Sequence, residues 1–189
     1  HLQVGGQALK VAQANIRRNL ESVFANVDTS IGLSKFRSVK VYVLGDVAGP
    51  GGYIFPSGSN TFSALLSAGG IKKSGTLRRI QLIRGDRVVR TIDLYGILQS
   101  ARGFVGDELS EGDVIFVPPI GDTVALVGAV KKPGIYEVLE QSRVSSLLTY
   151  SGGALPFANP GHVLVERTDA AQRRVVMDLG FEQLDKIEK

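Results

Sequence analysis

Apolar and polar residues alternate in a short stretch that begins near residue 39. Val39, Val41 and Val43 lie two positions apart, which is the spacing of a β-strand with one buried face. Pro50-Gly51 then favours a tight turn, because proline fixes φ and glycine accepts positive φ. Apolar residues resume over residues 52–55. This pattern predicts a β-hairpin.

The next segments predict a short helix, a second hairpin and a closing strand. Polar residues at 59–61 are capping candidates for a helix that runs through Ala68 and ends at Gly69-Gly70. The other expected elements are strands over 79–83, 88–94 and 114–117 and a short helix over 95–99. The order β-β-α-β-β-α-β is that of a β-grasp, an α+β fold in which a mixed sheet wraps around one helix.

A helical pattern precedes this region. Apolar residues recur three or four positions apart, at Leu9, Ala12, Ile16, Leu20 and Val23. This spacing predicts one amphipathic helix over about residues 7–25.

The segment that contains the alternating valines occurs twice. Residues 41–53 align with residues 124–136, 83 positions later, and six of the 13 aligned residues are identical. A period of this length is too long for a solenoid and predicts two small domains in tandem. The matched turn residues are expected to be structural: Gly45, Pro50, Gly51, Gly69 and Gly70 in the first copy, and Gly128, Pro133, Gly134, Gly152 and Gly153 in the second.

The second copy departs from the first towards its end. Residues 91–94 match residues 176–179 at an offset of 85, which predicts two extra residues in the preceding turn. Only ten residues follow Leu179, too few to reach a counterpart of the strand over 114–117. We therefore expect a second domain that is truncated at its C-terminal end. The predicted parts are a helix and linker over 1–38, a first domain over 39–120 and a second domain over 121–189.

The amino-acid composition excludes several kinds of catalytic and metal-binding site. The 189 residues include no Cys, which excludes disulfides, thiolate metal sites and cysteine nucleophiles. His1 and His162 are too few for a multi-histidine metal centre. The acid pair Asp107 and Glu108 lacks the apolar neighbours that a glycosidase general acid needs. We predict no enzymatic activity, no catalytic residues, no metal and no cofactor.

Together these motifs resemble the soluble-ligand-binding β-grasp (SLBB) domains of bacterial polysaccharide export proteins. The resemblance is carried by V-x-V-x-G-D-V-x-x-P-G-x-Y over 41–53, A-G-G-I over 68–71 and L-x-x-G-D-V-I-F-V-P-P over 109–119. The second copy keeps the Gly, Pro and Tyr positions but has Ala129 in place of Asp46. The N-terminal helix is similar to the tail of the export module that precedes such domains. The implied fold is a pair of tandem β-grasp (ubiquitin-like) domains behind that helix.

The resemblance implies a periplasmic part of an outer-membrane channel for capsule or exopolysaccharide. In such assemblies the β-grasp domains stack as rings, so the implied partners are further copies of the chain and a polysaccharide. An inner-membrane co-polymerase is compatible with this role. Nucleic acid is disfavoured, because the basic residues lack interleaved exposed aromatics. The alternatives are a monomeric periplasmic glycan-binding module and, with less support, an enzyme that acts on polysaccharide.

The net charge of +4 is unevenly distributed. Residues 72–90 hold seven Lys and Arg against one acid, whereas residues 93–113 hold five acids against one Arg. The two runs are either ordinary solvated faces or complementary faces of neighbouring ring subunits, and the basic run could also attract an acidic glycan. The candidate subunit or glycan contacts are Arg78, Arg79, Arg84, Arg87, Asp107, Glu108 and Glu111.

Three other features are assigned structural roles. Arg84-Gly85-Asp86 spells an adhesion tripeptide, but its aligned counterpart is Arg167-Thr168-Asp169, so we predict a hairpin turn. Tyr53 and Tyr136 follow their turns at matched positions and are expected to be at least half buried rather than stacked on sugar rings. His162 is expected at the surface.

Overall fold

The computed structural model describes residues 8–24, 37–100, 107–140, 142–169 and 171–186. It divides into two units, His1–Arg37 and Ser38–Lys189, and each is described by itself. In the first unit α1 spans Leu9–Val23, which confirms the predicted helix. Residues 7 and 25, at the ends of the predicted range, lie outside the described residues. No described helix has the length and apolar character needed to cross a bilayer.

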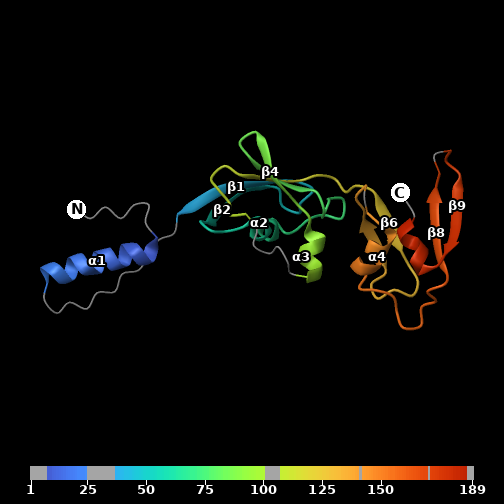
Figure 1. The fold of residues 1–189 in the computed structure, drawn as a ribbon. Coiled ribbons are helices and arrows are strands. Elements are labelled where there is room, and N and C mark those ends of the chain that lie inside the picture. The colour runs from blue at the N-terminus through green and yellow to red at the C-terminus, as the bar shows by residue number, and fades with distance from the viewer. Residues whose placement is uncertain (1–7, 25–36, 101–106, 141, 170, 187–189) are drawn as a thin grey trace. The chain divides into compact units, whose positions relative to one another are not determined.

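The first repeat, residues 39–120, has the predicted β-grasp arrangement (Figure 1). Its elements are β1 (Ser38–Gly45), β2 (Gly51–Pro56), α2 (Thr61–Ser67), β3 (Ile80–Arg84), β4 (Arg87–Ile92), α3 (Leu94–Ser100) and β5 (Val114–Val117). The five strands form one sheet in the order β2-β1-β5-β3-β4. β5 is parallel to β1, and the other neighbouring strands are antiparallel.

Alternation in β1 places its valines in the core of this domain. Val39, Val41 and Val43 are buried, together with Ala64 and Leu65 of α2. Asn60 is the N-cap of α2, and its Oδ1 accepts a hydrogen bond from the Ser63 amide at 2.9 Å. One face of the sheet therefore packs on α2 and the core, as the β-grasp pattern predicts.

The second repeat, residues 121–189, has the same kinds of element but is not closed into one sheet. Its elements are β6 (Thr123–Leu126), β7 (Gly134–Glu137), α4 (Val144–Tyr150), β8 (Val163–Thr168), β9 (Arg174–Leu179) and a 3-10 helix, η1 (Phe181–Lys186). β6 pairs with β7 and β8 pairs with β9, in two separate two-stranded sheets. Among the described residues, no strand of the second repeat takes the place that β5 occupies between β1 and β3.

Backbone hydrogen bonds confirm the 83-residue period. The amide of Val47 donates to the carbonyl of Gly45, and the amide of Val130 donates to that of Gly128. The glycine pairs that end α2 and α4 also correspond, since Gly70 donates to Leu65 and Gly153 donates to Leu148. The two Pro-Gly turns and the two Gly-Gly turns therefore lie in equivalent contexts.

The two offsets predicted for the second hairpin, 83 for its first strand and 85 for its second, do not both fit the strand register. Ile80 pairs with Ile92 in the first repeat, whereas Val163 pairs with Leu179 in the second. Matching these pairs requires the two offsets to sum to 170, whereas the predicted offsets sum to 168. The register of β3 and β4 also shifts between Leu82 and Ile83.

Candidate functional site

The tyrosines at matched positions of the two repeats anchor the Pro-Gly turns. Tyr53 Oη donates to the carbonyl of Gly49 at 2.5 Å, and Tyr136 Oη donates to the carbonyl of Lys132 at 2.6 Å. Each acceptor directly precedes the turn proline. Both tyrosines are more than half buried, as predicted. Both hydroxyls therefore have partners within the fold, as a structural role for these tyrosines predicts.

The two charged runs pair with each other inside the first repeat. Arg78 binds Asp93 at 3.0 Å, Arg84 binds Asp113 at 2.8 Å and Arg90 binds Asp107 at 2.9 Å. Burial alone would raise the pKa of the fully buried Asp113, but hydrogen bonds from Arg84 and the Ser110 amide, with the charge of Arg84, lower it. Three of the seven basic residues and three of the five acids in the two runs therefore have ion-pair partners within one domain.

The remaining charged candidates are more exposed. Arg87 lies on the exposed strand β4, and the Glu108 side chain is also exposed. Glu111 Oε2 accepts the amide of Lys40 at 2.9 Å. Contact of these residues, or of Arg79, with another subunit or a glycan stays a prediction. Arg78 and Arg84 already have partners within the chain.

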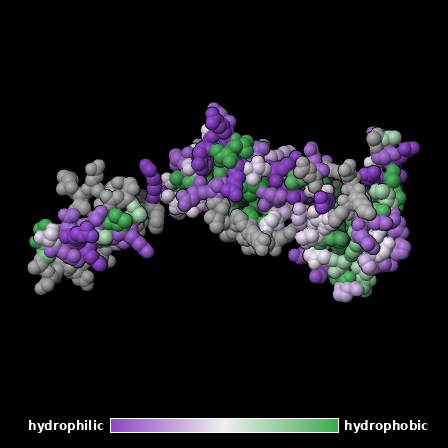
Figure 2. Space-filling model, viewed as in Figure 1, coloured by the Kyte–Doolittle hydropathy of each residue, from purple (hydrophilic) through white to green (hydrophobic). Residues whose placement is uncertain are grey.

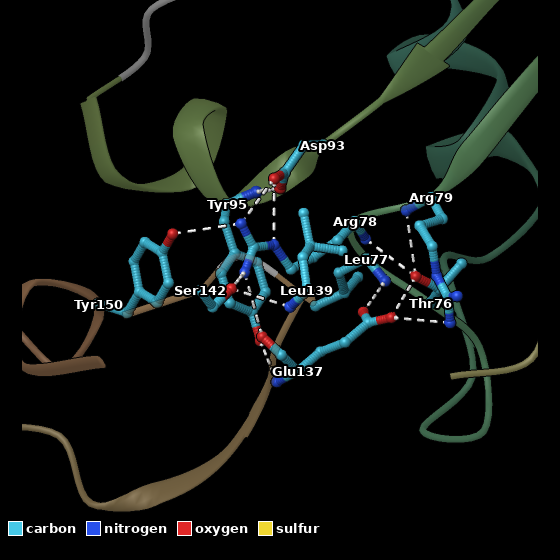
Figure 3. Close-up of polar contacts among 10 residues, drawn as sticks. All are labelled: Thr76, Leu77, Arg78, Arg79, Asp93, Tyr95, Glu137, Leu139, Ser142 and Tyr150. Atoms are coloured by element: carbon cyan, nitrogen blue, oxygen red, sulfur yellow. Dashed lines mark hydrogen bonds and ion pairs between the residues drawn. The ribbon is translucent and has the colours of Figure 1, made fainter. Parts of the chain in front are cut away.

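A buried polar network joins the two repeats, and Glu137 of β7 is one of its two centres (Figure 3). Its Oε1 accepts hydrogen bonds from Thr76 Oγ1 at 2.5 Å and from the Gly121 amide at 3.2 Å. Its Oε2 accepts the Leu77 amide at 2.9 Å. Arg79 Nη2 lies 3.8 Å from Oε1. The second repeat thereby inserts a carboxylate among donors from the first repeat and from Gly121, its own first residue.

Arg78 is the second centre of this network. It belongs to the first repeat and contacts the second, whereas Glu137 belongs to the second repeat and contacts the first. Its guanidinium donates to the carbonyl of Glu137 at 3.3 Å, to Ser142 Oγ at 3.4 Å and to Tyr150 Oη at 3.2 Å. It also lies over the rings of Tyr95 and Tyr150, 4.8 and 5.2 Å from their centroids. Burial alone would lower the pKa of Arg78, but the hydrogen bonds and charge of Asp93, helped by Tyr150, raise it. Arg78 therefore stays charged.

We call Thr76, Arg78, Asp93, Tyr95, Glu137 and Tyr150 the inter-repeat joint. Planar Arg78 and bidentate Glu137 accept only a narrow range of geometries, so the joint fixes how the second repeat meets the first. Sequence reasoning placed Arg78 among exposed charges and missed the others. The one clue was Glu137, a charged residue at the position where the first repeat has Ile54.

The other sequence candidates lie at the surface. His162 is exposed, and its Nδ1 lies 3.0 Å from Asp178 Oδ2. The Arg84-Gly85-Asp86 tripeptide forms the β3–β4 turn, as predicted, and its arginine is held by Asp113. Among the described residues, no group of three or more His, Asp or Glu side chains could hold a metal ion.

Comparison with known proteins gives one family and two relatives. The SLBB domain family model matches residues 40–93 and 123–177, more than half of the chain. Two Escherichia coli proteins, both named polysialic acid transport protein KpsD, are 29% and 28% identical over 177 residues. The alignments cover 92% of this chain and 31% of each relative. The chain therefore spans about a third of the length of the curated relatives it matches.

Proposed function

The chain belongs to the SLBB domain family, and from this premise we propose that it is a periplasmic part of an outer-membrane channel that exports capsule or exopolysaccharide. In this proposal the two repeats contribute successive layers of a homo-oligomeric ring. The polysaccharide passes through the ring, and an inner-membrane co-polymerase delivers it. The two E. coli relatives are named as polysialic acid transport proteins, which supports a role in polysaccharide export.

The observation that carries this proposal is the inter-repeat joint. Stacked ring layers require each layer to hold a fixed orientation to the next, because a loose linker would let the layers close independently. The joint supplies direct hydrogen bonds and one cation–π contact, between Arg78 and Tyr150, from one repeat to the other. The connecting segment is tied down as well, since the Ile120 amide donates to the Ser74 carbonyl at 2.7 Å. A glycan-binding module has no need of this rigidity.

A non-catalytic role is part of the proposal. The most deeply buried charged groups, Arg78, Asp113 and Glu137, each contact several groups of the same chain. Such fully satisfied networks specify a fold rather than provide a reactive group.

The proposal is tested in the source organism. Deletion of the gene is expected to abolish polysaccharide at the cell surface while polymer accumulates inside the cell. Expression of the wild-type gene is expected to restore it. Normal surface polysaccharide in the deletion strain would refute the export role.

The mass of the native protein separates the two structural hypotheses. A ring has many times the mass of one chain, whereas a monomeric glycan-binding module has the mass of one chain. Incubation of the purified protein with the cognate polysaccharide should leave the polymer's length distribution unchanged. Shortened polymer would indicate an enzyme instead.

A further inference from the structure

The second repeat exposes large apolar side chains at the end that carries its Pro-Gly turn. Phe157 is 79% exposed, Val127 is 77% exposed and Ile135 is 73% exposed. Figure 2 shows hydrophobic residues among hydrophilic ones at the surface of Ser38–Lys189. Side chains this accessible to solvent contribute little to the core of their own domain, so the fold gives no reason for these three to be apolar.

The fold brings the three residues to one end of the repeat. The register of β6 and β7 pairs Ile135 with the residue two positions before Val127. Since side chains two positions apart share a face of a strand, Val127 continues the face that carries Ile135. The turn that contains Phe157 is tied to the loop between β6 and β7, because the Leu155 amide donates to the Ala129 carbonyl at 2.9 Å. The exposed apolar residues are therefore not scattered over the repeat.

The same end of the repeat is positively charged. Lys131 and Lys132 lie in the loop between β6 and β7, and both are exposed. Among the described residues, neither lysine has an ion-pair partner. The two segments that meet here, 125–136 and 150–160, contain no Asp or Glu. We call the following five residues the apolar-basic tip: Val127, Lys131, Lys132, Ile135 and Phe157.

The first repeat shows that the fold does not require these side chains. At the equivalent positions, 83 residues earlier, it has Leu44, Ala48, Gly49, Gly52 and Ser74. The backbone is nevertheless the same, since the Leu155 amide donates to the Ala129 carbonyl as the Lys72 amide donates to the Asp46 carbonyl. The same turns therefore form without the apolar and basic side chains of the tip. Exposed apolar residues that the fold does not need indicate a binding surface.

We propose that the apolar-basic tip binds an anionic lipid surface and inserts its apolar side chains among the lipids. Peripheral membrane binding combines burial of apolar area with attraction between basic residues and anionic headgroups. The tip offers both, and lysine stems can lie along apolar surface while their ammonium groups reach the headgroups.

A bilayer fits the tip better than a protein partner does. The apolar side chains project from a hairpin and a neighbouring turn, whereas the anchor residues of protein interfaces fill matched pockets. Lipid chains are fluid and need no matched shape. The absence of acids from both segments of the tip also removes the repulsion that an anionic surface would otherwise meet. This inference applies to a single chain as well as to a ring, so it stands or falls separately from the proposed function.

The first test is cosedimentation of the purified protein with vesicles. Vesicles of phosphatidylcholine with phosphatidylglycerol are expected to bind it at least about 10-fold more tightly than phosphatidylcholine alone, and salt should weaken this binding. Lys131→Gln with Lys132→Gln should weaken binding by about 10-fold. The matched control, Lys72→Gln with Lys73→Gln, removes the same charge from two exposed lysines of the first repeat and should change binding by less than about 2-fold.

The second test measures insertion. The chain contains no Trp, so Phe157→Trp provides a single fluorescent reporter, whose emission should shift to the blue on vesicles that contain phosphatidylglycerol. The control Leu66→Trp, at a 62% exposed position of α2, should keep the emission of a tryptophan in water. Val127→Ser with Ile135→Ser should weaken binding by about 10-fold although both lysines remain. Circular dichroism verifies that each variant is folded.

Each outcome decides the inference. Binding that depends on the tip lysines, together with a blue shift from Phe157→Trp alone, supports it. Equal weakening by the Lys72→Gln/Lys73→Gln control would show that binding follows net charge rather than the tip, and overturns it. Binding without a blue shift is adsorption by charge alone and also overturns it. Absence of vesicle binding overturns it as well and leaves a protein as the partner of the tip, while the export role keeps its own test by gene deletion.

Discussion

The two repeats share their turns but differ in how well their cores are closed. Val41 and Val124 occupy equivalent positions 83 residues apart and pair with the matched tyrosines. Val41 is 0% exposed, whereas Val124 is 39% exposed. The first repeat has β5 between β1 and β3, and the described part of the second repeat has no strand at that place.

This difference separates what local sequence determines from what a distant strand contributes. The turns of both repeats keep their hydrogen bonds with or without a fifth strand, because their Pro, Gly and Tyr residues lie within a few positions of one another. Burial of the alternating valines instead depends on β5, which begins at Val114, about 70 residues after β1. The second repeat contacts the first through the inter-repeat joint. Glu137 of this joint occupies the position in the second repeat that Ile54 occupies in the first.

The largest expected effect comes from the joint. Glu137→Ala leaves buried donors at Thr76, Leu77 and Gly121 without an acceptor, and we expect it to lower the free energy of unfolding by about 3–5 kcal/mol. Hydrogen exchange at the amides of Leu77 and Gly121 should accelerate strongly. The matched control is Ile54→Ala at the equivalent, 73% exposed position, where we expect less than about 0.5 kcal/mol. Equal effects at both positions would show that the joint does not couple the repeats.

The next effect distinguishes two glycines that share a backbone conformation. Gly45 and Gly128 have φ of 87° and 93°, so alanine is strained by about 1–2 kcal/mol at either. At Gly45 a Cβ would also lie 2.1 Å from the carbonyl oxygen of Val117 in β5, whereas nothing lies within 4 Å at Gly128. We expect Gly45→Ala to cost about 2 kcal/mol more than Gly128→Ala in urea denaturation. Equal costs would mean that β5 moves aside freely.

Much of the fold could be predicted from the sequence. The capping residue Asn60 and the strand Val114–Val117 were predicted within the correct segments, because each depends on neighbouring residues. The offset of the second hairpin was harder to predict, because the Asp-Leu match gives 85 and the Arg-Val-Val shared by residues 87–89 and 174–176 gives 87. The strand register also shifts between Leu82 and Ile83, so no single offset describes the hairpin.

The candidate site was much less predictable. Arg78 and Asp93 are 15 residues apart, and Arg78 and Tyr150 are 72 apart, so neither period nor spacing indicates that they meet. A run of like charges is normally a solvated face. Here three residues of the basic run form ion pairs with three residues of the acidic run inside one domain. Only tertiary structure distinguishes that pairing from contact between subunits.

A third prediction isolates the effect of core closure. Val41→Ala removes buried methyl groups and leaves a cavity, so we expect a loss of about 2–3 kcal/mol. Val124→Ala deletes the same groups at a partly exposed position and should cost less than about 1 kcal/mol. Urea denaturation of both variants measures the difference. A loss at Val124 as large as that at Val41 would mean that the second repeat's core is closed in solution.

A fourth prediction concerns acid stability of the first repeat. The pKa of Asp113 lies below its ordinary value of 3.8, so the carboxylate stabilises the folded state above about pH 4. This stabilisation is lost as the pH falls through the lowered pKa. Asp113→Asn should therefore cost about 2 kcal/mol at pH 7 and progressively less in acid. A cost that is independent of pH would contradict the ion pair with Arg84.

The smallest effect should be the same in both repeats. Tyr53→Phe and Tyr136→Phe each remove one hydroxyl that holds the carbonyl before a turn proline. We expect each to cost about 1 kcal/mol, because a single hydrogen bond is lost while the ring stays in place. If the turns are independent of β5, the two costs will agree even though the two cores differ. A cost at Tyr53 several times that at Tyr136 would instead show that β5 stabilises the turn, and that the two repeats differ locally as well as in their cores.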